Sequence, residues 1–312
     1  MEFRQLMYVV QIAAERNFSR AAEKLHIAQP SLSQQLSKLE KELGVLLFKR
    51  STNSVEPTYA GTVFVEKARH ILDMVEQLRR EMEDIAELRR GRLVIGSLPM
   101  TGAHLLPLVI PAFRAAYPEI DLTLIEETTR NLEELTASGG TDVSLLSLPL
   151  TEPSLAYEPI LEEEIVLAVP AHHPLAKATA PVPLARLKDE PFILLKKGQG
   201  FRAIAHQLCH SAGFEPRIVF ESANIETIQS LIAAGMGIGF VPRMVARSVP
   251  VEPAPVYVPL AEKPTRTLVI AYRKGRYLSN AAEAFIRTFH RVIAELGPAA
   301  DGPGSANRRR RG

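Results

Sequence analysis

A row of hydrogen-bonding side chains near the N-terminus could read the edges of DNA bases. In QPSLSQQLSKLE, which begins at Gln29, the leucines recur at helical spacing and leave Ser33, Gln34, Ser37 and Lys38 facing outward. Glutamine can form two hydrogen bonds with adenine, and serine suits several base edges. The pattern is also typical of an ordinary helical bundle with a polar outer face, so this stretch alone leaves both interpretations open.

Three short polar segments further along the chain could bind a small anion. Each follows a β-rich run and precedes a helical one, and the free amides at a helix N-terminus favour anions. In the segment 198–202 the glycines permit close approach of the backbone, and the arginine can hold a carboxylate. The candidates are Ser97, Pro99, Met100, Thr101, Thr128, Thr129, Gly200, Phe201 and Arg202. Alternatively, these residues have only structural roles: Thr101 and Thr129 cap helices, Phe201 packs in a core and Arg202 pairs with a glutamate.

Three short helices are predicted to position the N-terminal row. Ser19 is the predicted N-cap of one helix. A second helix begins near Gln29 or Pro30, because proline suits a first turn, where its missing N–H would have no partner. The residues expected to face inward are Leu32, Leu36, Leu39 and Leu43 in this helix, and Phe3, Leu6, Val10 and Ala13 in a preceding one. Two short helices joined by a tight turn match a helix-turn-helix that enters the major groove.

A short hairpin is predicted after these helices. The stretch LLFKRSTNSVEPT reads as two extended runs around Asn53 and Ser54, with Lys49 and Arg50 at the base. We expect this wing to lie against DNA phosphates. The residues predicted to contact DNA are Ser19, Gln29, Pro30, Ser31, Ser33, Gln34, Ser37, Lys38, Arg50 and Asn53.

A long helix is predicted from Thr58, a suitable N-cap, to Arg90, because this stretch has no proline and little glycine. Its apolar residues repeat with spacings that alternate between four and three: Phe64, Ala68, Ile71, Val75, Leu78, Met82 and Ile85. The 3.5-residue period favours a partner helix, as in a coiled coil, over packing on the helix's own domain. A dimer would also hold two recognition helices for half-sites about 34 Å apart.

The composition and the pattern of the chain indicate its fold class and the compartment in which we expect it. The chain has 312 residues, 46% of them hydrophobic, a net charge of +2, and no apolar run near the roughly 18 residues that a membrane span needs. We see no secretion signal at the start, so we expect a cytoplasmic protein. From Gly91 onward, short β-rich runs alternate with helical stretches, which predicts an α/β architecture with mainly parallel sheets.

The chain resembles the LysR-type transcriptional regulators. The resemblance rests on FSRAAEKLHIAQPSLSQQLSKLEKELGVLLFKR followed by VEPTYAG, and the family pattern continues to about residue 291. It implies DNA contacts by Gln29, Pro30, Ser33 and Gln34. Two positions depart from the family pattern, since many members have arginine in place of Gln34 and a basic residue in place of Asn53.

The resemblance also implies how the chain is organised. The expected parts are a winged helix-turn-helix at 1–58, a dimerisation helix at 59–90, an effector-binding domain at 91–296 and a disordered basic tail at 297–312. The effector domain would have the two-lobed type 2 periplasmic-binding-protein fold, with lobe one at 92–161 and 266–295 and lobe two at 162–265. The three polar segments would converge across its cleft on an organic acid or another small anion. Dimers would form a homotetramer on promoter DNA, with RNA polymerase as a further candidate partner.

Three further motifs were considered as a nucleotide, metal or redox site, and none of them predicts one. GMGIGF, at residues 235–240, lacks the spacing of a dinucleotide loop and leads from helix to strand. His172 and His173 are adjacent, so they cannot share a helix face as metal ligands would. Cys209 resembles one redox cysteine of the family's peroxide-sensing branch, but the partner position, near Gly200, holds no cysteine, and we expect a buried inert thiol. We expect no cofactor, no metal and no catalytic site.

Two other classes of protein remain as alternatives. A solute-binding protein for transport would share the cleft, but it would need an export signal and would have no DNA reader. An enzyme with an attached DNA-binding module would need a nucleophile, metal or cofactor motif, and we find none in the sequence.

Overall fold

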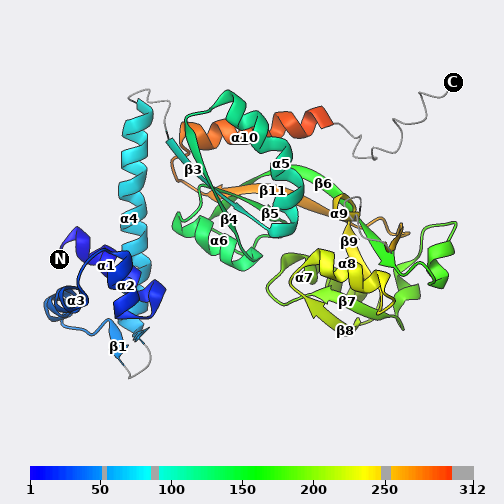
Figure 1. Ribbon diagram of the computed structural model, residues 1–312, viewed down its shortest axis with the longest axis horizontal. Coiled ribbons are helices and arrows are strands. Elements are labelled where there is room, and N and C mark those ends of the chain that lie inside the picture. The colour runs from blue at the N-terminus through cyan, green and yellow to red at the C-terminus, as the bar shows by residue number, and fades with distance from the viewer. Residues whose placement is uncertain (51–54, 86–90, 247–253, 297–312) are drawn as a thin grey trace. The chain divides into compact units, whose positions relative to one another are not determined.

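The computed structural model describes residues 1–50, 55–85, 91–246 and 254–296 (Figure 1). The chain divides into two compact units, residues 1–87 and 88–312, and each is described by itself. The predicted wing residue Asn53 and the predicted tail at 297–312 lie outside the described residues. Among the described helices, none combines the length and the apolarity that crossing a membrane requires.

The N-terminal unit contains the predicted helix-turn-helix, hairpin and long helix. Its described elements are α1 (Phe3–Glu15), α2 (Phe18–Lys24), α3 (Gln29–Leu43), β1 (Phe48–Arg50), β2 (Val55–Pro57) and α4 (Tyr59–Ile85). The two strands pair antiparallel, with Lys49 opposite Glu56. Helices α2 and α3 form the helix-turn-helix, and β1 and β2 form the arms of the wing.

The start of α2 is set by an asparagine, which corrects the prediction for Ser19. The Oδ1 atom of Asn17 accepts hydrogen bonds from the amides of Ser19 and Arg20, at 2.9 and 3.0 Å. The helix begins at Phe18, so Ser19 already lies in its first turn and cannot be the N-cap. Pro30 lies in the first turn of α3, as predicted.

Two contacts join the hairpin to the helices on either side. Glu40 of α3 is buried, and its Oε1 accepts hydrogen bonds from the amides of Leu47, at 2.7 Å, and Phe48, at 3.3 Å. Thr58 caps α4, because its Oγ1 accepts from the amide of Gly61 at 2.9 Å. A Cβ atom on Gly61 would overlap the carbonyl oxygen of Leu47, so α4 starts in direct contact with the backbone that leads into β1.

The core of this unit is formed by all its helices and by the first strand. Its buried members are Val9, Ile12, Ala21, Ala22, Leu32, Leu36, Leu39, Leu47, Phe48 and Val65. Two residues that were predicted to face inward are exposed: Phe3 by 45% and Leu43 by 38%. Phe3 opens α1 and Leu43 closes α3 just before the left-handed Gly44, so both lie in terminal turns beyond the core.

The C-terminal unit consists of two lobes (Figure 1). The elements of lobe one are β3 (Gly91–Ser97), α5 (Pro99–Ala116), β4 (Ile120–Glu126), α6 (Thr129–Ser138), β5 (Val143–Ser147) and α10 (Asn280–Leu296). The elements of lobe two are η1 (Pro174–Lys177), η2 (Leu184–Leu187), β7 (Pro191–Leu195), α7 (Gly200–Ser211), β8 (Arg217–Ser222), α8 (Ile225–Ala233), β9 (Gly239–Pro242), α9 (Arg243–Ala246) and β10 (Val256–Val258). Strands β6 (Leu155–Val169) and β11 (Thr265–Arg273) connect the lobes.

The sheets are mixed, which corrects the expectation of mainly parallel sheets. Strand β3 pairs parallel with β4 and β5, and β7 pairs parallel with β8. The connecting strand β11 pairs antiparallel with both β5 and β6, while β9 and β10 pair antiparallel with the second half of β6. The antiparallel pairs arise because the chain crosses to lobe two along β6 and returns along β11.

Each lobe has its own hydrophobic core. In lobe one, α5 and α10 pack on one face of the sheet, and Leu132 of α6 packs on the other (Figure 1). The core of lobe two is formed by residues between Ile165 and Leu260. Met244 of α9 packs against the cores of both lobes, and Met100 of α5 packs against the core of lobe two.

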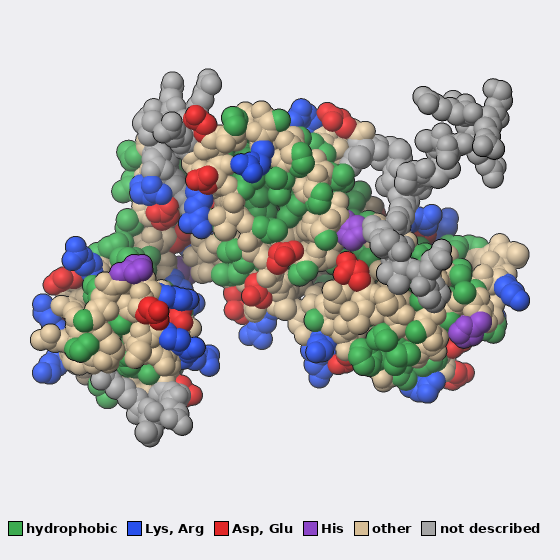
Figure 2. Space-filling view, viewed as in Figure 1, with side chains coloured by type: hydrophobic (Ala, Val, Ile, Leu, Met, Phe, Trp, Pro, Cys, Tyr) green, Lys and Arg blue, Asp and Glu red, His purple; other side chains and the backbone are tan. Residues whose placement is uncertain are grey.

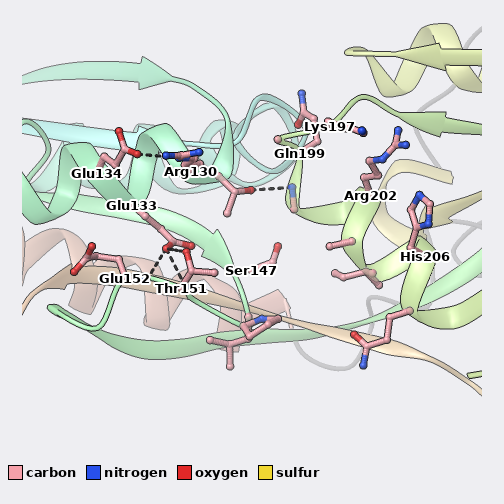
Figure 3. Close-up of a pocket in the computed structure, with 18 residues that line it drawn as sticks. Arg130, Glu133, Glu134, Ser147, Thr151, Glu152, Lys197, Gln199, Arg202 and His206 are labelled. Atoms are coloured by element: carbon pink, nitrogen blue, oxygen red, sulfur yellow. Dashed lines mark hydrogen bonds and ion pairs between the residues drawn. The ribbon is translucent and has the colours of Figure 1, made fainter. Parts of the chain in front are cut away.

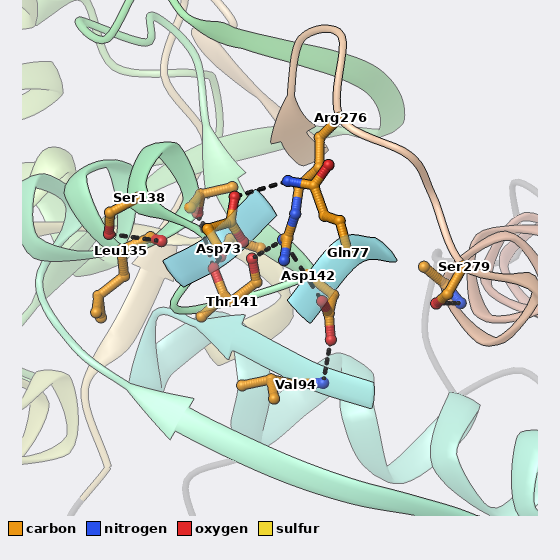
Figure 4. A network of polar contacts seen from close by, with 12 residues as sticks. Asp73, Gln77, Val94, Leu135, Ser138, Thr141, Asp142, Arg276 and Ser279 are labelled. Atoms are coloured by element: carbon orange, nitrogen blue, oxygen red, sulfur yellow. Dashed lines mark hydrogen bonds and ion pairs between the residues drawn. The ribbon is translucent and has the colours of Figure 1, made fainter. Parts of the chain in front are cut away.

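A buried polar network fixes one edge of lobe one (Figure 4). Asp142 accepts a hydrogen bond from the amide of Val94, at 2.8 Å, and pairs with Arg276, at 3.5 Å. Arg276 also donates to the carbonyl oxygen of Thr141, at 3.1 Å. The network therefore joins β3, the turn before β5 and the segment between β11 and α10.

Candidate DNA interface and effector site

The residues predicted to contact DNA are accessible on the helix-turn-helix. Gln29, Pro30, Ser31, Gln34 and Lys38 of α3 are exposed, and Ser33 and Ser37 are half-buried beside the inward leucines. Ser19 is exposed in the first turn of α2. Nζ of Lys38 lies 3.5 Å from a carboxylate oxygen of Glu2. The side chain of Arg50 lies outside the described residues, as does Asn53.

Four of the seven predicted dimerisation residues form an exposed apolar stripe along α4. Phe64 packs against the core of the N-terminal unit, and Ala68 is buried. Further along the helix, Ile71, Val75, Leu78 and Met82 are 40, 46, 58 and 50% exposed. Apolar side chains at heptad spacing that remain in water are typical of a helix that packs against a partner. The side chain of Ile85 lies outside the described residues.

Two cavities lie between the lobes of the C-terminal unit. The larger measures about 710 Å³ and is lined by α6, the segment 147–152 and the start of α7 (Figure 3). The smaller measures about 390 Å³ and is lined by the starts of α5, α7 and α8. Gly200 lines both, and its amide donates a hydrogen bond to Oγ1 of Thr129, at 3.0 Å. This bond links the first residue of α7 in lobe two to the first residue of α6 in lobe one.

Several charged groups that line the larger cavity already have partners within the protein (Figure 3). Arg130 pairs with Glu134 at 3.0 Å. The buried Glu133 accepts hydrogen bonds from the amide and hydroxyl of Thr151, at 2.9 and 2.6 Å. Arg202 pairs with Glu221, which is the structural alternative considered for this arginine, and also donates to a backbone carbonyl. Arg202 is therefore already neutralised at the edge of the cavity.

The other predicted effector residues fall into two groups. Pro99, Met100 and Phe201 line the smaller cavity. Ser97, Thr101 and Thr128 line neither cavity. Ser97 ends β3 and Thr101 lies in the first turn of α5, and both are fully buried; Thr128 caps α6 by accepting a hydrogen bond from the amide of Asn131 at 3.4 Å. The structure thus brings three predicted segments to one interlobe region but turns several of their side chains inward.

The sequence reasoning missed a buried ion pair where the lobes join. Arg266 of β11 and Glu163 of β6 lie opposite each other in the sheet, and their side chains are 0 and 5% exposed. Arg266 donates from Nε to Oε2 of Glu163 at 2.8 Å, and Oε1 of Glu163 accepts from the amide of Met244 at 2.7 Å. Burial lowers the pKa of Arg266, and Glu163 opposes that shift. The available signal was weak, because Glu163 and Arg266 stand one or two residues before the apolar runs IVLAVP and LVIAY and are not flanked by apolar residues on both sides.

The helices that point at the interlobe region differ in how their N-termini are capped. Thr128 caps α6 and Asn224 caps α8 with side-chain oxygens. Neither α5, which follows Leu98, nor α7, which follows Gln199, has a side-chain cap. Uncapped N-terminal amides attract anions, whereas Glu126 and Glu226, which line the same smaller cavity, oppose them.

Cys209 is buried, and His173 is held by contacts within lobe two. Burial, with a smaller effect of Glu215, raises the pKa of Cys209 to about 12, so its thiol is protonated at neutral pH. His173 accepts a hydrogen bond from the amide of Leu175 and lies 3.3 Å from Glu190. Over the described ranges, no group of three metal-binding side chains has suitable geometry.

Comparison with known proteins agrees with this architecture. Residues 3–62 match the model of the bacterial regulatory helix-turn-helix proteins of the lysR family, and residues 86–294 match the LysR substrate binding domain. The chain is 40% identical over 303 residues to the uncharacterized HTH-type transcriptional regulator YcgK of Bacillus subtilis, covering 92% of this chain and 93% of the relative. It is 34% identical over 284 residues to the DNA-binding transcriptional dual regulator OxyR of Escherichia coli, covering 91 and 93%.

Two solved structures share the fold along almost the whole chain. A full-length OxyR variant from Pseudomonas aeruginosa superposes with a TM-score of 0.73 at 31% identity, covering 94% of each chain. Full-length CbnR in complex with its target DNA superposes with a TM-score of 0.66 at 26% identity, covering 94% of this chain and all of CbnR. With both family models matched in order, the chain belongs to the LysR family and is a DNA-binding transcriptional regulator with a C-terminal effector-binding domain.

Proposed function

We propose that α3 reads promoter DNA in the major groove and that a small anionic effector, bound between the lobes, modulates this binding. The reader would be residues 1–58, the dimerisation helix 59–90 and the effector domain 91–296. The interlobe cavities carry the proposal, because residues of both lobes line them and the bond between Gly200 and Thr129 joins the lobes there. A ligand in the larger cavity would contact both residues that this bond joins, and we propose that it changes the closure of the lobes through them.

The DNA-reading role of α3 is supported by its exposed polar face. Gln34 and Lys38 are exposed there, with Ser33 and Ser37 half-buried next to them. Gln34 would form paired hydrogen bonds with adenine, and Lys38 would pair with phosphate. Replacing Gln34 with alanine is expected to change base preference at one position. A uniform loss of affinity on all sequences would argue against base reading by Gln34.

Dimerisation through α4 is supported by the exposed stripe described above. Further apolar side chains are exposed on the effector domain, where hydrophobic groups gather over β8 (Figure 2). They include Val219 and Phe220 on β8, Leu124 on β4 and Leu108 on α5, each more than 40% exposed. These surfaces support assembly of dimers into a homotetramer. The protein would act in the cytoplasm without catalytic activity, and RNA polymerase is a further candidate partner.

The effector shifts DNA binding only by its differential affinity for the two lobe arrangements, commonly about 1–3 kcal/mol. DNase footprinting on the promoter of the neighbouring gene, repeated with metabolites that raise the melting temperature of the protein, tests reader and effector together. We expect a protected region that contains two half-sites and changes in extent with such a metabolite. No preference for the promoter over random duplex would contradict the DNA-binding part. A footprint that stays the same with every stabilising metabolite would contradict the effector part.

A further inference from the structure

Glu133 of α6 is a buried carboxylate whose described partners are all neutral. The residue is 2% exposed. Its Oε2 accepts hydrogen bonds from the amide and the hydroxyl of Thr151, at 2.9 and 2.6 Å, and from the amide of Glu152, at 2.8 Å (Figure 3). No ion pair joins Glu133 to a basic residue in the described part of the chain. A buried glutamate is rarely found without a paired positive charge, because an uncompensated buried charge is costly. Glu133 is therefore suited to a positive group from outside the protein.

The second carboxylate oxygen of Glu133 is free to meet such a group. Oε1 accepts no hydrogen bond from a described residue. Unlike the hydroxyl of Thr101, this oxygen is not closed off from solvent. Glu133 lines the larger cavity between the lobes, which measures about 710 Å³. A ligand in this cavity can therefore contact Oε1 without displacing the three hydrogen bonds that Oε2 accepts.

The basic residues that line the larger cavity do not compensate Glu133. Arg130, Arg202 and His206 each have a different glutamate within ion-pair distance. Lys197 is exposed, and it lies in lobe two, whereas Glu133 belongs to lobe one. The lobe-one side of the cavity therefore presents a carboxylate whose charge no described side chain neutralises.

The rest of the lining favours an organic cation over a metal ion. Leu148, Pro149, Ala203 and Ile204 give the cavity apolar walls, which suit a carbon skeleton. A metal ion needs several ligands, and among the described residues no group of three metal-binding side chains has suitable geometry. An ammonium group needs only acceptors for its N–H bonds, and a carboxylate oxygen is the strongest acceptor that a protein offers it.

We propose that the effector carries an ammonium group, which pairs with Oε1 of Glu133, in addition to its acid group. The effector is then an amino acid or a similar zwitterion, and not a simple organic acid. The inference rests on the proposed function, since it assumes that the effector binds between the lobes. Pairing with Glu133 anchors the effector on lobe one.

The experiment uses the full-length protein and pairs of probes that differ only in the amino group. Glycine, alanine, aspartate, glutamate and phenylalanine are compared with acetate, propionate, succinate, glutarate and hydrocinnamate, and sodium chloride balances the ionic strength. Magnesium chloride and calcium chloride are tested as inorganic cations. The melting temperature identifies the probes that bind, and calorimetry gives their dissociation constants.

Two variants separate the charge of Glu133 from its structural contacts. Glu133→Gln keeps the size of the side chain and one oxygen for the donors of Thr151 and Glu152, but it removes the negative charge. Glu134→Gln is the matched control. Glu134 is the next residue of α6 and lines the same cavity, but its carboxylate is 63% exposed and pairs with Arg130. Both variants lose one negative charge, so a difference between them is not a general effect of net charge.

We expect at least one amino acid to bind the parent protein at least about tenfold more tightly than its deaminated acid, the range for a hydrogen bond to a charged group. Glu133→Gln should remove this difference, because it weakens binding of the amino acid and leaves binding of the acid nearly unchanged. Glu134→Gln should keep the difference. A purely structural role for Glu133 would weaken both members of a pair alike.

Several outcomes would overturn the inference. It fails if no amino acid binds more tightly than its deaminated acid, if Glu133→Gln keeps the difference, or if Glu133→Gln weakens both members equally. Binding of magnesium or calcium alone would also overturn it.

The DNase footprint distinguishes this failure from a failure of the proposed function. If deaminated acids bind and change the footprint without any preference for an amino group, the effector role of the cavity stands and the ammonium site fails. If an amino acid binds through Glu133 but no probe changes the footprint, the ammonium site stands and the effector role fails.

Discussion

Replacing Glu40 with alanine tests how the wing is held on the recognition helix. The change removes the acceptor of two buried amides, those of Leu47 and Phe48, at 2.7 and 3.3 Å. A hydrogen bond to a charged group contributes about 1.5–3 kcal/mol, and the second bond here is long, so we expect a loss of about 3 kcal/mol from the unfolding free energy of the N-terminal unit. For a unit of this size 1 kcal/mol changes the Tm by about 4–8 °C, which gives a fall of about 12–24 °C.

Calorimetry of the full-length protein measures this fall, and a DNA-binding assay adds an independent readout. Glu42→Ala is the matched control, because Glu42 lies on the same helix with an exposed carboxylate. Removing a negative charge near phosphates would by itself strengthen DNA binding, whereas a displaced wing weakens it. We expect weaker binding for Glu40→Ala only. Equal melting temperatures for the two variants, or stronger DNA binding by Glu40→Ala, would refute the role given to this carboxylate.

Three further predictions concern packing, assembly and reactivity. Gly61→Ala should destabilise the N-terminal unit by about 1–3 kcal/mol in thermal denaturation, despite the higher helix propensity of alanine, because the new Cβ would overlap the carbonyl oxygen of Leu47; a more stable variant would contradict the close contact. Leu78→Glu should shift sedimentation from dimer toward monomer, since Leu78 is 58% exposed on the stripe of α4; an unchanged dimer would place the interface elsewhere. Cys209, with a pKa of about 12, should resist alkylation by iodoacetamide at pH 7 until the protein is unfolded, as followed by mass spectrometry; rapid labelling of the native protein would show an accessible thiolate.

The N-terminal unit was largely predictable because its signals are local. The leucines of α3, the proline at its start and the threonine before α4 each act within one or two turns, and the structure has them as expected. The errors were also local. Asn17 and Ser19 are both good N-caps and lie two residues apart, so sequence alone did not decide between them. Leu43 continues the leucine spacing but lies where Gly44 ends the helix.

The effector domain was less predictable because its decisive contacts join distant residues. Alternating strands and helices indicated the α/β class, but the antiparallel pairing of β6 with β11 connects residues about a hundred positions apart. The polar segments before α5, α6 and α7 lie between a strand and a helix, as the sequence indicated. The sequence could not show that Thr101 is buried or that Arg202 forms an ion pair with Glu221. Arg266 was missed because a charge on a strand gains meaning only when its partner on the facing strand is known.

The pairing of β6 and β11 makes lobe two an insertion in lobe one. Glu164 lies opposite Thr265 in the last antiparallel step before the strands part, so a tight turn at that point could replace everything between them. Lobe one would keep its sheet and its helices α5, α6 and α10 on one continuous path. A gene that lost the inserted segment would thus still encode a foldable half, and the fold could have gained its cleft by the reverse event.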